Sequence, residues 1–171
     1  ELIREKNIEV LPLLINFGEE SYLDGVEITT KEMIDKINAT GVLPTTAQVT
    51  PNRFEETFKK YLDQGYKIVT LVLSSEMSGT YQSACIAKDM LETEDIVVID
   101  SRNVTSGLGL LVLKACQFRD KGLGIKEIEE EILKAIPKVK SSLNFESLEN
   151  LVRGGRLSKT AGTIGSVLGL R

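Results

Sequence analysis

The chain has 171 residues, of which 42% are hydrophobic and 5% aromatic, and its formal net charge is −4. This hydrophobic share is enough for a folded core, whereas the negative charge and the scarcity of aromatic rings argue against binding to a nucleic-acid backbone or to its bases. The sequence contains no run of about 18 apolar residues, which a transmembrane helix would require. It also contains no histidine, the commonest general base and metal ligand.

Short apolar runs alternate with amphipathic segments along most of the chain, and this alternation predicts strands and helices in turn. The expected strands cover residues 8–17, 67–73 and 95–100, and the expected helices cover residues 31–38, 51–64, 80–91, 106–120 and 125–136. The second and third strands are nearly continuous runs of Val, Ile and Leu, which is typical of strands buried on both faces. We therefore predict an α/β fold with a mainly parallel sheet and helices on both faces.

Turn and capping residues indicate where the first elements begin and end. Pro12 cannot donate a ladder hydrogen bond, so the first strand is expected to be irregular or to lie at a sheet edge. Asp24–Gly25 is a hairpin signal, and Thr30 is the expected N-cap of the first helix. Residues 39–51 are expected to form a loop, and the pair Thr50–Pro51 is expected to begin the second helix as cap and first helical residue.

Residues 137–171 differ from the rest of the chain, because they combine a possible strand, a short helix, a glycine turn and a helix of small residues. We interpret residues 1–137 as one α/β domain and residues 138–171 as the truncated beginning of a second α/β domain. The chain opens on what is typical of the end of a helix, and it stops within a pattern. The sequence is therefore interpreted as a fragment at both ends.

The two cysteines, Cys85 and Cys116, each lie in an apolar, helix-like segment. Cysteine is among the residues most often buried, so two reduced buried thiols are the first interpretation. A disulfide or a reactive pair is the alternative. Reduced thiols are typical of a cytoplasmic protein.

Polar segments follow the two apolar strands, where α/β proteins bind ligands. Ser74–Gly79 follows one strand, residues 100–106 follow the other, and Thr45–Thr46 lies in a loop that can reach the same edge. These segments offer hydroxyls, backbone N–H groups and the positive end of a helix dipole, with Asp100 as the single carboxylate. Because no neighbour is recognised that would activate a serine, the pattern favours anion binding, and the alternative is that the serines only cap the helix. An enzyme for a small anionic substrate, with Asp100 or Ser78 as a participant, also stays open.

A second singular stretch is the glycine pair that Arg153 and Arg156 flank. One interpretation is a solvated connection between two helices. The other is a cationic contact surface or a wall that faces an anion.

Five ordered blocks of the sequence resemble the signature blocks of the DegV family, and together they cover nearly the whole chain. The blocks are PLLINFGEESYLDGVEITTKEM, LPTTAQVTP, SSEMSGTYQSA, VVIDSRNVTSGLGLLV and LENLVRGGRLSK. The resemblance implies a bacterial cytoplasmic fatty-acid-binding protein without catalytic residues, metal or cofactor. It further implies a ligand such as palmitate and a partner, an ATP-dependent fatty acid kinase that phosphorylates the carboxyl group.

The same resemblance implies which residues bind the carboxylate at the mouth of an apolar tunnel that holds the acyl tail. Thr46 corresponds to the threonine of the family's T-S-Q-P block, Ser78 corresponds to its carboxylate-binding serine, and the amide of Gly79 is a further donor. Thr45 and Ser75 are weaker candidates. With such a partner, our hypothesis is that Arg153 and Arg156 contact the partner or the acyl phosphate.

The sequence departs from the family pattern at several places. Ala47 replaces the serine that usually follows the threonine, which removes one hydroxyl, and Val49 replaces a proline. The family's first strand is expected before Glu1. Most of the second domain, with a histidine near the head group, is expected after Arg171.

Overall fold

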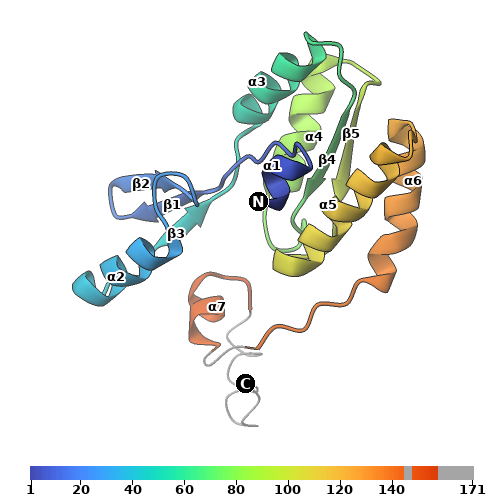
Figure 1. Ribbon diagram of the computed structural model, residues 1–171. Helices are drawn as coiled ribbons and strands as arrows, with labels where there is room; N and C mark the ends of the chain where they lie inside the picture. The colour runs from blue at the N-terminus through green and yellow to red at the C-terminus, as the bar shows by residue number, and fades with distance from the viewer. Residues whose placement is uncertain (145–147, 158–171) are drawn as a thin grey trace. The chain divides into compact units, whose positions relative to one another are not determined.

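The computed structural model describes residues 1–144 and 148–157, and it divides the chain into two compact units, residues 1–140 and 141–171 (Figure 1). Each unit is described by itself. The interpretation of residues 138–171 as the beginning of a second α/β domain stays a prediction. The small-residue helix expected near the C-terminus lies outside the described residues.

Helices and strands alternate irregularly in the first unit, and the described part of the second unit contains one short helix. The elements are α1 (Leu2–Glu5), β1 (Leu14–Phe17), β2 (Glu20–Leu23), α2 (Thr30–Thr40), β3 (Thr45–Ala47), α3 (Pro51–Leu62), β4 (Ile68–Val72), α4 (Thr80–Leu91), β5 (Ile96–Asp100), α5 (Thr105–Asp120), α6 (Ile125–Ala135), the 3-10 helix η1 (Ile136–Lys138) and, in the second unit, α7 (Glu149–Arg153).

The centre of the first unit is the parallel pair β4 and β5, which run in register from Ile68 opposite Ile96 to Val72 opposite Asp100. Helices α3 and α4 cover one face of this pair, and α5 and α6 cover the other (Figure 1). Because strand side chains alternate between faces, Ile96 packs beneath α3 and α4, whereas Ile99 packs beneath α5 and α6. The prediction of an α/β fold with helices on both faces is confirmed.

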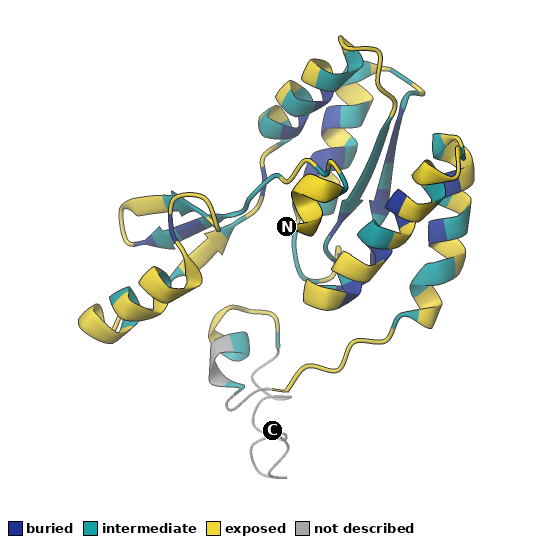
Figure 2. Ribbon diagram, viewed as in Figure 1, coloured by how far each residue is buried: buried dark blue, intermediate teal, exposed yellow. Residues whose placement is uncertain are grey.

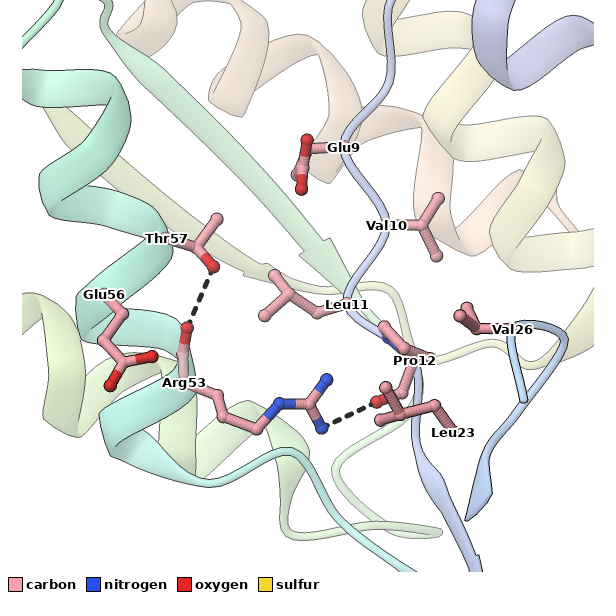
Figure 3. A pocket seen from close by; sticks show the side chains of 9 residues that line it. All are labelled: Glu9, Val10, Leu11, Pro12, Leu23, Val26, Arg53, Glu56 and Thr57. Carbon is pink, nitrogen blue, oxygen red and sulfur yellow. Dashed lines mark hydrogen bonds between the residues drawn. The ribbon is translucent and has the colours of Figure 1, made fainter.

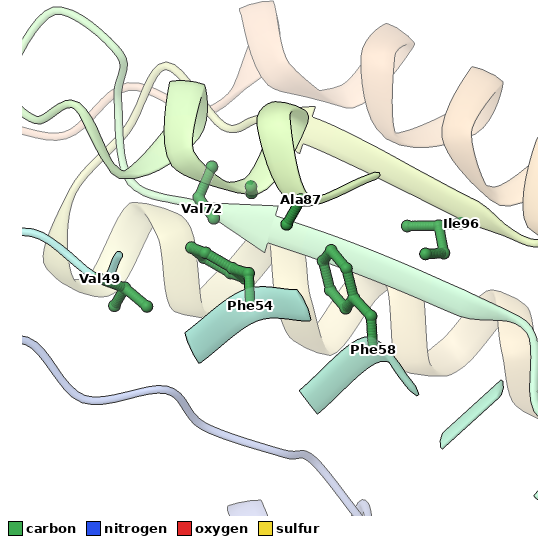
Figure 4. Packing of buried hydrophobic residues seen from close by; sticks show 7 residues of the cluster. Val49, Phe54, Phe58, Val72, Ala87 and Ile96 are labelled. Carbon is green, nitrogen blue, oxygen red and sulfur yellow. The ribbon is translucent and has the colours of Figure 1, made fainter. Parts of the chain in front are cut away.

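Apolar side chains of α3 fill the space between this helix, α4 and the sheet (Figure 4). The rings of Phe54 and Phe58 are buried, with centroids 5.6 Å apart. Ala84 and Ala87 of α4 are completely buried, and their small side chains leave room for the rings. Figure 2 shows that the buried residues of the first unit lie mainly on the inner faces of these strands and helices.

A second sheet, which is antiparallel, was not expected from the sequence. Its order is β2-β1-β3, with Ile15 of β1 opposite both Tyr22 and Thr46. The expected loop at residues 39–51 therefore contains a short strand. Among the strands of the described residues, the pair β4–β5 alone is parallel. The first strand begins at Leu14 rather than at residue 8, because Pro12 has no N–H to donate, and its carbonyl accepts a hydrogen bond from Arg53 Nη1 at 2.9 Å.

Two local predictions were wrong and one was confirmed. The hairpin between β1 and β2 turns at Gly18, which has a φ of 62°. A turn does form at Asp24–Gly25, where Gly25 has a φ of 70°, but it does not join these two strands. The N-cap of α2 is Thr29 rather than Thr30, because the Glu32 carboxylate accepts from the Thr29 N–H at 2.8 Å and completes a capping box. Thr50 and Pro51 begin α3 as predicted.

Both cysteines are free, with Cys116 buried and Cys85 half-buried. Among the described residues, no helix combines the length and the hydrophobicity that a membrane span requires.

Two neighbouring residues of α6 test the packing of the first unit. Ile132 is completely buried against Ile99 and Leu111, whereas Leu133 is 53% exposed. Ile132→Ala is expected to lower the free energy of unfolding by about 2–5 kcal/mol, because it leaves a cavity, and Leu133→Ala by less than about 1 kcal/mol. Urea denaturation followed by circular dichroism measures both. Equal losses would contradict the assignment of the buried face of α6.

Candidate functional site

The ends of β4 and β5 define one polar edge of the parallel sheet. Val72 and Asp100, the last residues of the two strands, are paired. The two loops that follow therefore leave the sheet side by side, as the sequence predicts for parallel strands. One loop carries Ser74–Gly79 and the other carries residues 101–104.

The buried hydroxyl and amide groups closest to the sheet bond to one another. The Ser101 N–H donates to the Val72 carbonyl at 3.1 Å, and the Ser101 hydroxyl donates to the Asn103 carbonyl at 3.0 Å. The same carbonyl accepts from the Ser74 N–H at 2.9 Å. These groups join the two loops, so their role is structural.

The Asp100 carboxylate accepts three hydrogen bonds, two of which come from the serine loop. Its carboxylate accepts from the Ser75 hydroxyl at 2.6 Å, from the Ser75 N–H at 3.1 Å and from the Arg102 N–H at 3.0 Å. The side chain is only 15% exposed, and the Arg102 guanidinium lies 3.9 Å away. The Ser75 hydroxyl, a weaker candidate for ligand binding, thus donates its hydrogen bond to Asp100.

These contacts set the protonation of Asp100. Burial alone raises the pKa of this carboxyl, but the hydrogen bonds from the Ser75 hydroxyl and from the two N–H groups outweigh burial, and the net pKa lies below its ordinary value. The group is therefore ionised at neutral pH and its oxygens are occupied. Such a carboxylate is a poor general base, which speaks against the enzyme alternative.

Ser78 and Gly79 stand at the beginning of α4. The half-buried Ser78 Oγ lies 2.9 Å from Thr80 Oγ1 and accepts from the Thr80 N–H at 3.3 Å. The N-cap of α4 is Gly79, which has no side chain to cap the helix. No acceptor for its N–H is found within the described part of the chain. The positive end of the helix and a free donor thus remain at this point.

The second predicted segment reaches α4 through Gln48. Thr45 and Thr46 are exposed residues of β3, and Gln48 follows this strand directly. The Gln48 amide nitrogen donates to Ser83 Oγ in α4 at 3.0 Å. Its amide oxygen lies so close to Gly79 that a Cβ atom there would be 2.1 Å away. Sequence reasoning gave Gln48 no role, although the residue stands in the block LPTTAQVTP.

A pocket of about 300 Å³ lies elsewhere in the first unit (Figure 3). It is lined by Glu9, Val10, Leu11, Pro12, Leu23, Val26, Arg53, Glu56 and Thr57. Its single guanidinium, from Arg53, donates to the Pro12 carbonyl, and two carboxylates share the lining. Because these carboxylates repel anions and no predicted site residue lines the pocket, we do not assign the predicted tunnel to it.

The glycine turn of the second unit has the expected form. Gly155 has a φ of 75°, and the Arg156 N–H donates to the Leu151 carbonyl at 2.9 Å. Arg153, at the end of α7, and Arg156 are both exposed. A contact of these arginines with a partner or an anion stays a prediction. Within residues 1–144 and 148–157, no three His, Cys, Asp or Glu side chains are grouped to hold a metal ion.

Comparison with known sequences gives one family. The sequence model of the DegV family matches residues 1–171. A DegV domain-containing protein of Clostridium acetobutylicum is 59% identical over 170 residues, which are 99% of this chain and 61% of that protein. The chain therefore spans less than two thirds of the length of this relative.

Comparison with solved structures gives the same family. A DegV family protein of Thermus thermophilus, described by its fatty acid binding, has a TM-score of 0.83 at 27% identity, over 98% of this chain and 59% of that chain. The fatty acid kinase B3 protein of Streptococcus pneumoniae, loaded with linoleic acid, has a TM-score of 0.73 at 27% identity, over 90% of this chain and 54% of that chain.

The hydrogen bonds of Asp100 predict a pH-dependent stability. Because the pKa is lower in the folded protein than in the unfolded chain, ionised Asp100 stabilises the fold above the ordinary carboxyl pKa, and this stabilisation is lost as the pH falls through the folded value. Asp100→Asn is therefore expected to cost about 1–3 kcal/mol at pH 7 and progressively less below about pH 4.

Urea denaturation at a series of pH values measures this difference. Asp89→Asn, at an exposed position of α4, is the matched control and is expected to change little at any pH. A loss for Asp100→Asn that does not depend on pH would contradict the account of this carboxylate.

Proposed function

This chain belongs to the DegV family, and from that premise we propose that it binds a long-chain fatty acid such as palmitate. The hydroxyls of Thr46 and Ser78 and the N–H of Gly79 hold the carboxylate. The acyl tail lies in an apolar tunnel. The observation that carries the proposal is the contact of Gln48 with Gly79 and Ser83, because it brings the segment of Thr46 to the start of α4.

The chemistry of these groups suits a carboxylate. Hydroxyls and backbone N–H groups are neutral donors, and the N-terminus of the twelve-residue helix α4 favours a negative charge. The nearby carboxylate of Asp100 accepts hydrogen bonds from Ser75 and Arg102, so its charge is compensated within the protein. The remaining donors are available to an acid from outside.

The acyl tail supplies most of the binding free energy. Each methylene that is buried contributes about 0.8 kcal/mol, so a tail of about 14 methylenes contributes roughly 11 kcal/mol before ordering costs. A carboxylate held by neutral donors adds about 1–3 kcal/mol. The tunnel walls therefore determine affinity, and Thr46 and Ser78 determine the position of the head group.

We assign no catalytic step to this protein. It presents the carboxyl group to an ATP-dependent fatty acid kinase, which forms the acyl phosphate. The likeness to the pneumococcal fatty acid kinase B3 protein supports this partner. The free thiols of Cys85 and Cys116 support a reducing compartment such as the cytoplasm. An enzyme for a small anionic substrate has less support, because the oxygens of Asp100 are occupied by hydrogen bonds.

Ligand binding to the intact protein tests the two contributions separately. Ser78→Ala is expected to weaken palmitate binding about tenfold, since one hydrogen bond to a charged group is lost. Shortening the ligand by four methylenes is expected to weaken binding by about two orders of magnitude. Isothermal titration calorimetry measures both, with Thr30→Ala, at an exposed position of α2, as the control. If Ser78→Ala binds palmitate like the unsubstituted protein, the head-group assignment is wrong.

Charge reversal at the glycine turn tests the kinase contact. Replacing Arg153 and Arg156 together by Glu is expected to reduce acyl phosphate formation by the kinase at least about tenfold, because interface charges of the wrong sign repel the partner. Palmitate affinity is expected to stay unchanged. Lys121→Glu, at an exposed position of the first unit, is the control. Unchanged acyl phosphate formation would refute the contact.

A further inference from the structure

Gln48 makes two contacts with α4 that differ in kind. Its Nε2 donates to the hydroxyl of Ser83, a residue that is only 2% exposed, at 3.0 Å. Its Oε1 lies above the α-carbon of Gly79. The next residue, Val49, is buried among Phe54, Phe58 and Val72. The chain after β3 is thus tied to α4 by a hydrogen bond and anchored in the core immediately afterwards.

The glycine at position 79 is explained by Gln48. Its backbone has a φ of −70° and a ψ of 3°, which is a conformation open to any residue. Glycine is therefore not required by the backbone. The Cβ atom of any other residue would lie 2.1 Å from the amide oxygen of Gln48, so the Gln48 side chain would have to move away. Gln48 and Gly79 form a matched pair, one side chain filling the room that the other residue leaves.

The hydrogen bond from Gln48 to Ser83 also limits where Thr46 can lie. Gln48 is two residues beyond Thr46, and one extended residue spans only about 3.3 Å. Fixing the Gln48 amide on Ser83 and Gly79 therefore fixes the segment of Thr46 relative to the start of α4. Gln48 itself is engaged with Ser83, so its amide nitrogen is not the group that meets a ligand.

We propose that Gln48 is a positioning residue, which sets the spacing between the Thr46 hydroxyl and the donors of Ser78 and Gly79 and so makes the site selective for a carboxylate over an uncharged head group. The proposal rests on the proposed function. Without the hydrogen bond from Gln48 to Ser83, β3 is still held by its pairing with β1, but Thr46 is no longer held at a fixed distance from α4. A carboxylate needs several donors at once, whereas an alcohol needs one, so the acid loses more.

Stability measurements test the geometry without any ligand. Gly79→Ala is expected to lower the Tm of the intact protein by roughly 2–4 °C, because the new methyl group displaces Gln48 from its hydrogen bond with Ser83. In a Gln48→Ala background the same change is expected to leave the Tm unchanged or to raise it, since alanine restricts the unfolded chain. An equal decrease of the Tm in both backgrounds would overturn the matched pair.

Ligand selectivity tests the positioning role. Gln48→Ala is expected to weaken palmitate binding roughly 5- to 20-fold, and binding of hexadecanol, which has the same tail, less than about twofold. Ser83→Ala removes the acceptor alone and is expected to act in the same direction. Gln82→Ala, at an exposed position of the same helix, is the matched control and is expected to change neither affinity. A merely structural role of Gln48 would weaken both ligands equally.

The outcomes separate this inference from the proposed function. If the unsubstituted protein does not bind palmitate, the proposed function is overturned, and the positioning role with it. If it binds palmitate but Gln48→Ala leaves the ratio of the two affinities unchanged, only the positioning role is overturned. A selective loss for palmitate supports both.

Discussion

The parallel pairing of β4 with β5 is the constraint on which the site depends. Helices cover both faces of β4 and β5. Polar groups of this sheet can therefore meet a ligand only at the ends of the strands. Because Val72 pairs with Asp100, the two loops emerge together. Asp100, the last residue of β5, accepts hydrogen bonds from Ser75 of one loop and from Arg102 of the other. A single carboxylate thus fixes the loop that leads to Ser78, Gly79 and the start of α4.

This arrangement separates charge compensation from ligand binding. Two acceptors at this edge, the Asp100 carboxylate and the Asn103 carbonyl, accept hydrogen bonds from residues of the two loops. The groups at the start of α4 include donors, namely a backbone N–H and hydroxyls together with the helix dipole, beside the amide oxygen of Gln48. A site of this composition favours a negatively charged head group. This composition supports the proposal that this edge of the sheet binds an anionic head group.

The sequence predicted the elements whose signal is local. β4 and β5 are continuous apolar runs, and α4 was placed at its observed bounds from its periodicity and the serine loop before it. The strand β3 was missed because three residues beside Pro44 carry little local signal, and its partner β1 lies about thirty positions earlier in the chain. The cap of α2 was placed one residue too late, although Glu32 stands three residues after Thr29 and completes the capping pattern.

For the site, the sequence indicated which segments matter but not how they meet. Family resemblance pointed to Thr46 and Ser78, and the position of the loops at the strand ends followed from the α/β pattern. The role of Gln48 was out of reach, because its partner Ser83 lies 35 residues later. The engagement of Ser75 by Asp100 likewise depends on a pairing between two strands, and no local pattern encodes it.

A crystal structure of the intact protein with palmitate tests the central claim most directly, since it locates the head group. We predict that both Thr46 Oγ1 and Ser78 Oγ lie about 2.5–3.0 Å from the carboxylate oxygens, with the tail enclosed by apolar side chains. A carboxylate bound at another place, or close packing of side chains where the tail should lie, would contradict the account.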